Sequence, residues 1–341
     1  MIGKNIKYYR LMRGMSQEAL AQQIGLNKMA VSNYEMGKRT PDLATIRKIA
    51  DALQVTIGKL TVNYSKELVI KHGAFRKHSR ITKAAQELIL GYMDRYLARL
   101  FDVVSFFGDA ALAPSPQIEP VSAADYESAG QHLRQILELP ASGPIGNITD
   151  ILENKGYIIC PVSIKERQFS GNSGTVNGRP YIAVNTTMPA ERQRFTLIHE
   201  LAHLVFTFSD GQDEERMVDG ISGAFLLPES DVIRKLGPKR SDIRGELRYI
   251  QYEYNVSMAS VVMRAYQTGV IGKSTCESTQ KWMSAQGYRK DEKSGIQPEE
   301  SHLLERLTMR AVAEEEITVS KAAELLERSV TEVRELCYGG V

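Results

Sequence analysis

Apolar and polar positions recur with helical spacing along the first sixty residues. Short apolar stripes are separated by glycine-containing turns, which predicts a bundle of short helices over residues 3–60. Ser16 and Asn27 stand where helix N-caps are expected, and Gly25 between them ends one helix before the next begins. The pattern predicts an all-α N-terminal domain at residues 1–62.

The pattern changes after this domain. A long amphipathic helix is predicted over about 81–106, and further along two apolar strands near 157–162 and 181–184 lie among helical segments. We therefore predict a helical connector and linker, an α+β domain and a charged helical C-terminal region, with these bounds: 63–120, 121–275 and 276–341.

Composition restricts the class of protein. The chain has 341 residues, 43% of them hydrophobic and 25% charged, as in ordinary globular proteins of two or three domains. No apolar run is long enough to span a membrane, and the first residues lack the apolar core of a secretory signal. Three cysteines stand far apart without a CxxC pair. We expect a cytoplasmic protein without a membrane partner.

Charge is distributed unevenly along the chain. Residues 1–80 hold 15 Lys and Arg against 5 Asp and Glu, whereas the remainder holds 28 against 36. A basic first module on an acidic body suits binding to nucleic-acid phosphates.

The basic module has the layout of a helix-turn-helix. A helix over 17–24, a turn at Gly25-Leu26 and a second helix from Asn27 would place that second helix in the major groove of a double-stranded DNA operator. Asn and Gln can pair with adenine, and Lys and Arg can bind guanine or phosphate. The candidate DNA contacts are Gln17, Asn27, Lys28, Met29, Ser32, Asn33, Lys38 and Arg39.

Two segments, 15–21 and 31–41, resemble the phage-repressor-like (Xre/Cro) helix-turn-helix family. The resemblance covers essentially all of residues 3–60. It implies operator binding, commonly as a dimer, so a homodimer is expected.

A second motif, His199-Glu200-Leu201-Ala202-His203, lies in a helical apolar frame. Histidines four residues apart share one helix face and can hold one Zn²⁺ ion. Glu200 between them can reach a water on that ion, whose pKa zinc lowers toward ~7, and take its proton for attack on a peptide carbonyl.

A catalytic zinc site needs a third ligand. Glu215 and Asp219 are again four residues apart, so a second helix could present Glu215 to the metal. Asp219 could then accept a hydrogen bond from a ligand histidine. The adjacent Glu214 remains an alternative third ligand.

The segment from about 127 to 270 resembles the ImmA/IrrE metallopeptidases, through Gly143-Pro144-Ile145, Arg194-Phe195-Thr196 and the block from Ser222 to Pro228. The resemblance implies a gluzincin-like (thermolysin-like) fold, with His199, His203 and Glu215 as zinc ligands and Glu200 as general base and acid. Met217, Val218 and Ile221 depart from the residues common in the family, which is why Glu214 stays open.

Further features near the motif suggest roles in substrate binding. The strand 181–184 is expected to offer its edge to an extended substrate. Gly171, Gly174 and Gly178 are interpreted as turn residues of a hairpin. For an oxyanion-stabilising group the sequence offers three residues and does not choose between them: Tyr254, Arg264 and Tyr266.

Two functions fit these motifs. The first is a transcriptional regulator whose zinc endopeptidase domain cleaves a repressor, a partner protein or itself, in a stress response or a mobile element. The alternative is a non-proteolytic antitoxin or repressor of a two-gene module, partnered with a toxin, whose metal domain is a binding or sensing scaffold. Glu200 separates them, because hydrolysis needs its carboxylate and a structural zinc site does not.

Overall fold

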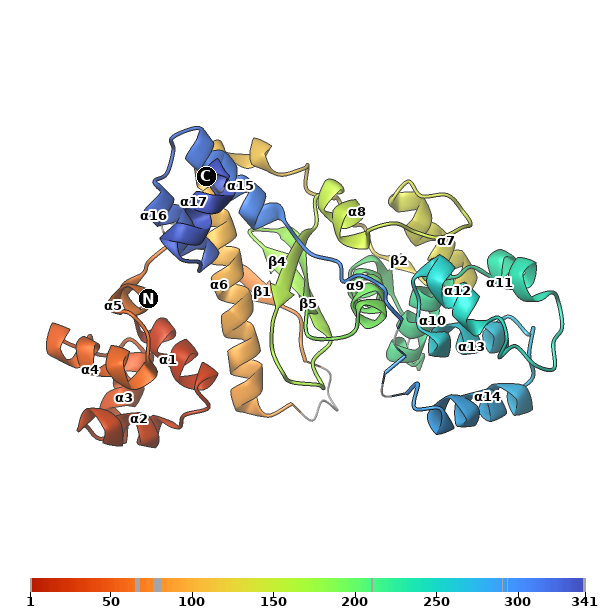
Figure 1. Cartoon of the computed structure of the whole chain (residues 1–341), viewed down its shortest axis with the longest axis horizontal. Coiled ribbons are helices and arrows are strands. Elements are labelled where there is room, and N and C mark those ends of the chain that lie inside the picture. Colours follow the sequence, from red (N-terminus) through yellow and green to blue (C-terminus); the bar gives the residue numbers. More distant parts are fainter. Residues whose placement is uncertain are drawn as a thin grey trace. The chain divides into compact units, whose positions relative to one another are not determined.

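The computed structural model describes residues 2–64, 68–75, 81–209, 211–289, 291–292 and 294–339. Their contacts divide the chain into two compact units. A helical unit contains the chain up to residue 68, residues 75–111 and the chain from residue 304. A mixed unit contains residues 69–74 and 112–303 (Figure 1). The four predicted segments thus contribute to two units, and the stretch 276–303 lies in the mixed one.

The helical unit begins with five short helices: α1 (Ile2–Met12), α2 (Gln17–Ile24), α3 (Lys28–Glu35), α4 (Leu43–Leu53) and α5 (Ile57–Thr61). The predicted caps are present, since the Ser16 hydroxyl accepts from the Ala19 amide at 3.0 Å and Asn27 Oδ1 from the Ala30 amide at 2.8 Å. Gly25 has a φ of 71°, in the left-handed region that glycine tolerates. The predicted all-α N-terminal domain is confirmed.

The core of these five helices includes one buried ion pair. Arg10 of α1 donates to Glu35 of α3 from Nε at 2.5 Å and from Nη2 at 3.0 Å, while its Nη1 donates to the Met15 carbonyl at 2.7 Å. Apolar residues of α1 to α5 pack around the pair: Ile6, Leu20, Ile24, Val31, Ile49, Leu53 and Leu60. This ion pair fixes how α1 packs on α3, because separating Arg10 from Glu35 would leave a buried charge without its partner.

Four more helices complete the unit: α6 (Lys83–Phe107) and, from the end of the chain, α15 (Leu303–Ala313), α16 (Val319–Leu326) and α17 (Val330–Tyr338). Arg95 of α6 donates to Asn5 Oδ1 at 3.0 Å, to the Tyr9 hydroxyl at 2.9 Å and to Glu327 Oε1 at 2.8 Å. The connector helix predicted from the sequence, α6, therefore packs on α1. Glu327, which follows α16, binds the same Arg95 guanidinium.

The mixed unit contains a four-stranded sheet in the order β1 (Ile70–His72), β4 (Gly171–Val176), β5 (Arg179–Asn185), β3 (Ile158–Val162). β4 pairs antiparallel with both neighbours, and β3 pairs parallel with β5. Because β5 has a partner on each side, the prediction that residues 181–184 offer a strand edge to substrate is wrong. Exposed edges of this sheet belong to its outer strands.

The hairpin predicted from the glycines is present, but only one of the three lies in its turn. Asn177 and Gly178, with φ of 51° and 82°, link β4 to β5 as the tight turn of an antiparallel hairpin requires. Gly171 and Gly174 lie inside β4, so reading them as turn residues was wrong. In a strand, glycine commonly marks close approach of another chain segment.

Eight helices and a small parallel pair accompany the sheet in the described part of this unit. They are α7 (Tyr126–Ile136), α8 (Ile148–Asn154), α9 (Ala190–Val205), α10 (Glu214–Leu226), α11 (Glu229–Leu236), α12 (Leu247–Tyr254), α13 (Met258–Gln267) and α14 (Lys273–Ala285), with β2 (Val121–Ser122) beside β6 (Phe206–Thr207). Leu197, Ile198 and Leu201 of α9 share one core with Ile182 and Val184 of β5. The sheet therefore supports the helix that carries the histidine motif.

Among the described residues, no helix combines the length and the hydropathy needed to cross a bilayer.

Candidate metal centre

The helix that carries the histidine motif, α9, is held firmly at its first turns. Gln193 Nε2 donates to the Met188 carbonyl at 2.7 Å, and Arg194 donates to the carbonyls of Ile145 and Gly146, each at 2.9 Å. Arg194 also forms a buried ion pair with Glu299. His199 and Glu200, one turn further, are only 4% and 9% exposed, so their orientations are fixed by packing.

Three candidate ligands from α9 and α10 lie together. His199 Nε2 and His203 Nε2 face each other at 3.1 Å, and the carboxylate of Glu215 lies 3.5 Å from the first and 3.7 Å from the second. Bonds of about 2.0–2.1 Å in a tetrahedral zinc site separate two ligating atoms by about 3.3 Å. The three side chains form the one group in the described residues whose ligand atoms all lie within 4.8 Å of one another. Their chemistry and spacing fit a zinc ion.

The other ring nitrogen of each histidine contacts a different carboxylate. Asp219 Oδ1 lies 3.0 Å from His199 Nδ1, and Glu214 Oε1 lies 3.0 Å from His203 Nδ1. A carboxylate on the far nitrogen fixes the tautomer and orientation of a metal-binding imidazole. The geometry therefore separates the two neighbouring glutamates, because Glu215 faces both Nε2 atoms and Glu214 faces the opposite side of one ring.

The electrostatic surroundings of His199 act in two directions. Burial lowers the pKa of the imidazole, while the hydrogen bonds with Asp219 and Glu215 and the charge of Glu200 raise it, and the net pKa lies above the ordinary value of 6.5. The carboxylates around the ring thus outweigh the cost of burying its charged form.

Glu200 has a partner that the sequence analysis missed. The hydroxyl of Ser173, on β4, donates to Glu200 Oε2 at 2.9 Å. Two residues earlier, a Cβ on Gly171 would lie 2.4 Å from Thr196 Cγ2 and 3.3 Å from Glu200 Cγ. β4 therefore runs directly beside the motif. Only the alternation of side chains along β4 hints at this in the sequence, because Gly171 and Ser173 share one face.

Small residues allow α10 to approach its neighbours. A Cβ on Gly220 would meet the Tyr126 ring of α7 at 2.4 Å, and one on Gly223 would lie 2.9 Å from Arg264 Cδ of α13. These close contacts set the position of α10, which brings Glu215 and Asp219 to α9.

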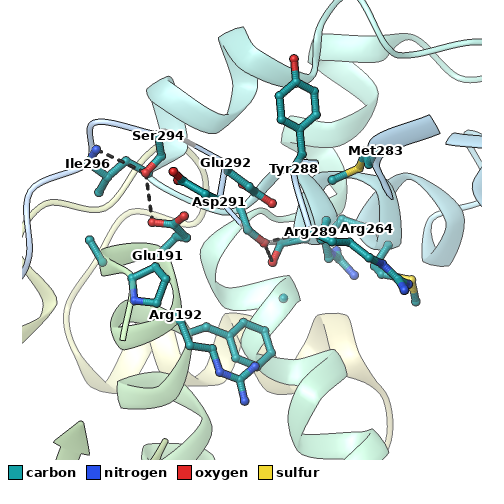
Figure 2. A pocket seen from close by; sticks show the side chains of 18 of the residues that line it. Glu191, Arg192, Arg264, Met283, Tyr288, Arg289, Asp291, Glu292, Ser294 and Ile296 are labelled. Carbon is teal, nitrogen blue, oxygen red and sulfur yellow. Dashed lines mark hydrogen bonds between the residues drawn. The ribbon is translucent and has the colours of Figure 1, made fainter. Parts of the chain in front are cut away.

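A pocket of about 700 Å³ opens beside Asp219. Figure 2 shows Glu191, from the start of α9, facing the segment that carries Glu292 and Ser294. The Ser294 hydroxyl donates to Glu191 Oε2 at 3.1 Å. Burial raises the pKa of Glu292, although the Met258 amide donates to its carboxylate at 2.8 Å. The pocket thus combines charged groups with apolar ones and reaches Asp219, which contacts His199.

The three proposed oxyanion-stabilising residues lie in different surroundings. Arg264 lines the pocket, but its Nε donates to the Leu227 carbonyl at 2.9 Å and its Nη2 to Glu127. The buried Tyr254 hydroxyl accepts from Arg234 at 2.8 Å. Tyr266 is 40% exposed. Arg264 and Tyr254 are therefore engaged in holding the fold.

The candidate DNA contacts lie on α2, α3 and the turn after α3. Asn27, Lys28, Met29, Lys38 and Arg39 are exposed, whereas Gln17, Ser32 and Asn33 are half-buried. A DNA contact by Gln17 requires a free side-chain amide, but its Nε2 donates to Glu35 Oε2 at 2.7 Å, so this donor is engaged inside the domain. Asn27 Oδ1 is engaged as the cap of α3.

Comparison with known protein families gives two matches. Residues 6–60 match the helix-turn-helix family, and residues 159–266 match the peptidase M78 family, described as the IrrE N-terminal-like domain. The first match begins within α1 and ends within α5, and the second runs from within β3 to within α13 and includes both helices of the candidate metal centre. No solved structure matches the chain significantly.

Three curated relatives, all HTH-type transcriptional regulators of Bacillus subtilis strain 168, match part of the chain. YqaE is 31% identical over 74 residues, which is 22% of this chain and 64% of that protein. The SPbeta prophage-derived YonR is 36% identical over 56 residues, 16% of this chain and 52% of that protein. YazB is 31% identical over 58 residues, 17% of this chain and 84% of that protein. The chain thus spans less than two thirds of the length of the first two.

Proposed function

We propose that the IrrE-like peptidase M78 domain of this chain is a zinc-dependent endopeptidase. The proposal proceeds from the family of the chain, which belongs to the HTH-type transcriptional regulators. The substrate in this proposal is a repressor or partner protein, or the chain itself, and its cleavage controls expression of the genes to which the helix-turn-helix domain binds. A gluzincin-like arrangement of the peptidase domain is part of the proposal.

The observation that carries this proposal is the convergence of His199, His203 and Glu215 around the facing Nε2 atoms, with Glu200 beside them. These three side chains would hold the zinc, and Asp219 would orient His199 through Nδ1. Bound zinc would supply a Lewis acid that polarises a peptide carbonyl and makes a nearby water more acidic.

Glu200 would carry the proton. Its carboxylate would accept a proton from the attacking water and deliver it to the nitrogen of the leaving amine, as a general base and then a general acid. The hydroxyl of Ser173 occupies one lone pair of Oε2, which orients the carboxylate and leaves Oε1 for the water. Ser173 is therefore a positioning residue in this proposal.

The substitution Glu200→Gln tests the proteolytic role directly. We expect it to abolish the response of a reporter under the protein's own promoter to inducing stress, while the purified variant keeps its zinc. The amide cannot accept the proton, whereas the ligands are unchanged. Glu277→Gln, an exposed glutamate of α14, is the matched control and should respond normally.

A normal response of the reporter in Glu200→Gln to every inducing stress would contradict the peptidase proposal. The metal domain would then act as a scaffold, as in a non-proteolytic repressor or antitoxin.

Two substitutions in the helix-turn-helix should separate reading of bases from binding of phosphates. Lys38→Ala should weaken binding to promoter DNA and to random DNA alike and reduce the salt slope by about 1. Asn33→Ala should weaken promoter binding alone, by about 1–3 kcal/mol. Fluorescence anisotropy at several salt concentrations measures both. Equal effects of Asn33→Ala on the two DNAs would contradict a base contact by Asn33.

The expected homodimer remains a prediction, which sedimentation of the same samples would check.

A further inference from the structure

We infer that the edge formed by Ser173 to Val176 of β4 and the turn residue Asn177 is a binding site for an extended peptide, and that residues 69–73 of the chain itself occupy this site. This inference rests on the proposed peptidase function, because residues 69–73 lie where the substrate of that peptidase would bind.

The segment is paired with β4 along its whole length. Ile70, Lys71 and His72 lie opposite Val176, Thr175 and Gly174. Beyond β1 the pairing continues on both sides, since the Asn177 amide donates to the Val69 carbonyl at 2.9 Å and the Gly73 amide donates to the Ser173 carbonyl at 2.7 Å. Asn172 Nδ2 also donates to the Gly73 carbonyl at 3.1 Å.

Two glycines make this close pairing possible. A Cβ on Gly73 would lie 2.5 Å from the Ser173 carbonyl oxygen, and a Cβ on Gly174 would lie 2.2 Å from the Lys71 carbonyl oxygen. Between them, His72 Nδ1 lies 2.6 Å from the Tyr181 hydroxyl of β5. The two backbones are thus fitted to each other at the end of the segment nearest the motif.

The same edge leads to Glu200. Ser173, whose carbonyl accepts from Gly73, is the residue whose hydroxyl donates to Glu200 Oε2. A peptide that continued in this antiparallel register would next lie opposite Asn172 and then Gly171, whose Cβ position is 3.3 Å from Glu200 Cγ. An extended chain on this edge therefore runs toward the proposed catalytic carboxylate.

Most of the recognition is between main chains. The side chain of Lys71 is exposed and that of Val69 is 63% exposed, so the β4 edge contacts few side chains of the segment. Addition of a strand through backbone hydrogen bonds is a general mode of peptide recognition, in which one extended segment can replace another. A substrate peptide would thus have to displace residues 69–73, which makes the segment an intrinsic competitor.

The alternation of an antiparallel ladder supplies a matched pair of variants. Because residues 69 and 73 exchange hydrogen bonds with β4, the amide of Lys71 also faces β4, whereas that of Ile70 faces away. Lys71→Pro removes a ladder donor and should release the segment. Ile70→Pro places the same ring one residue earlier, where an edge strand tolerates it, and is the control.

The probe is a fluorescein-labelled peptide with the sequence of residues 68–75, Leu-Val-Ile-Lys-His-Gly-Ala-Phe. All titrations use the full chain with Glu200→Gln, so that binding is measured without turnover. We expect the peptide to bind Lys71→Pro at least about tenfold more tightly than the parent or Ile70→Pro. Gly73→Ala, which brings a Cβ against the Ser173 carbonyl, should act in the same direction and is the second variant if Lys71→Pro fails to fold.

Equal affinity for all four proteins, or no binding to either opened variant, would overturn the inference. Either result leaves the reporter experiment with Glu200→Gln unaffected. Conversely, a normal stress response of Glu200→Gln would overturn the peptidase proposal while tighter peptide binding to Lys71→Pro still established the site.

Discussion

Replacing Glu215 by Ala should abolish zinc binding at the candidate metal centre, whereas replacing its neighbour Glu214 by Ala should only weaken it. The carboxylate of Glu215 faces His199 Nε2 at 3.5 Å and His203 Nε2 at 3.7 Å, in the position of a third ligand. The carboxylate of Glu214 instead meets His203 Nδ1, on the opposite side of that ring.

The magnitudes should differ clearly. Loss of a carboxylate that orients a ligand histidine lowers metal affinity about 10- to 100-fold, and loss of a ligand should exceed that range. Zinc content after dialysis against a chelator of graded strength measures both, with about one zinc per chain expected for the parent. Retention of zinc by Glu215→Ala together with its loss from Glu214→Ala would reverse the assignment of the two glutamates.

The second large effect is a loss of stability, and it is expected from a residue far from the candidate ligands in sequence, Glu299. Glu299→Ala should lower the free energy of unfolding of the mixed unit by about 3–5 kcal/mol, because it leaves a buried arginine without its counter-charge. The side chains of Arg194 and Glu299 are 4% and 5% exposed, and the Thr149 amide also donates to Glu299 Oε2 at 2.8 Å. One carboxylate thus joins the start of α8 to the first turns of α9.

Chemical denaturation followed by tyrosine and tryptophan fluorescence would measure this loss. Glu300→Ala is the matched control, because Glu300 is the exposed neighbour of Glu299 and its removal should change the stability by no more than about 0.5 kcal/mol. A Glu299→Ala variant as stable as Glu300→Ala would show that the buried pair contributes little to holding α9.

The dependence of α9 on Glu299 was not visible in the sequence. The sequence places Glu299 within a charged helical C-terminal region, and the stretch around it is rich in polar residues. Its composition is that of an exposed loop, and burial of one glutamate in it depends on an arginine 105 positions away. No local pattern of hydrophobic and polar residues carries that information.

The sequence by itself determined what depends on neighbours within a few positions. The caps at Ser16 and Asn27 and the turn at Gly25 lie where predicted, because capping and left-handed turns are decided by the residue at that position. His199 and His203 share a face of α9 because four residues make nearly one helical turn, and the same spacing puts Glu215 and Asp219 on one face of α10.

The tertiary structure alone decided which segments meet. It placed Ser173 on Glu200, assigned Glu214 and Glu215 to opposite sides of the histidine rings, buried β5 between two strands and laid residues 69–73 along β4. Each of these contacts joins residues whose proximity depends on how strands and helices pack across long stretches of chain. Helical and strand periodicity fixes which face a residue lies on, but the partner of that face is selected by close packing of the whole unit.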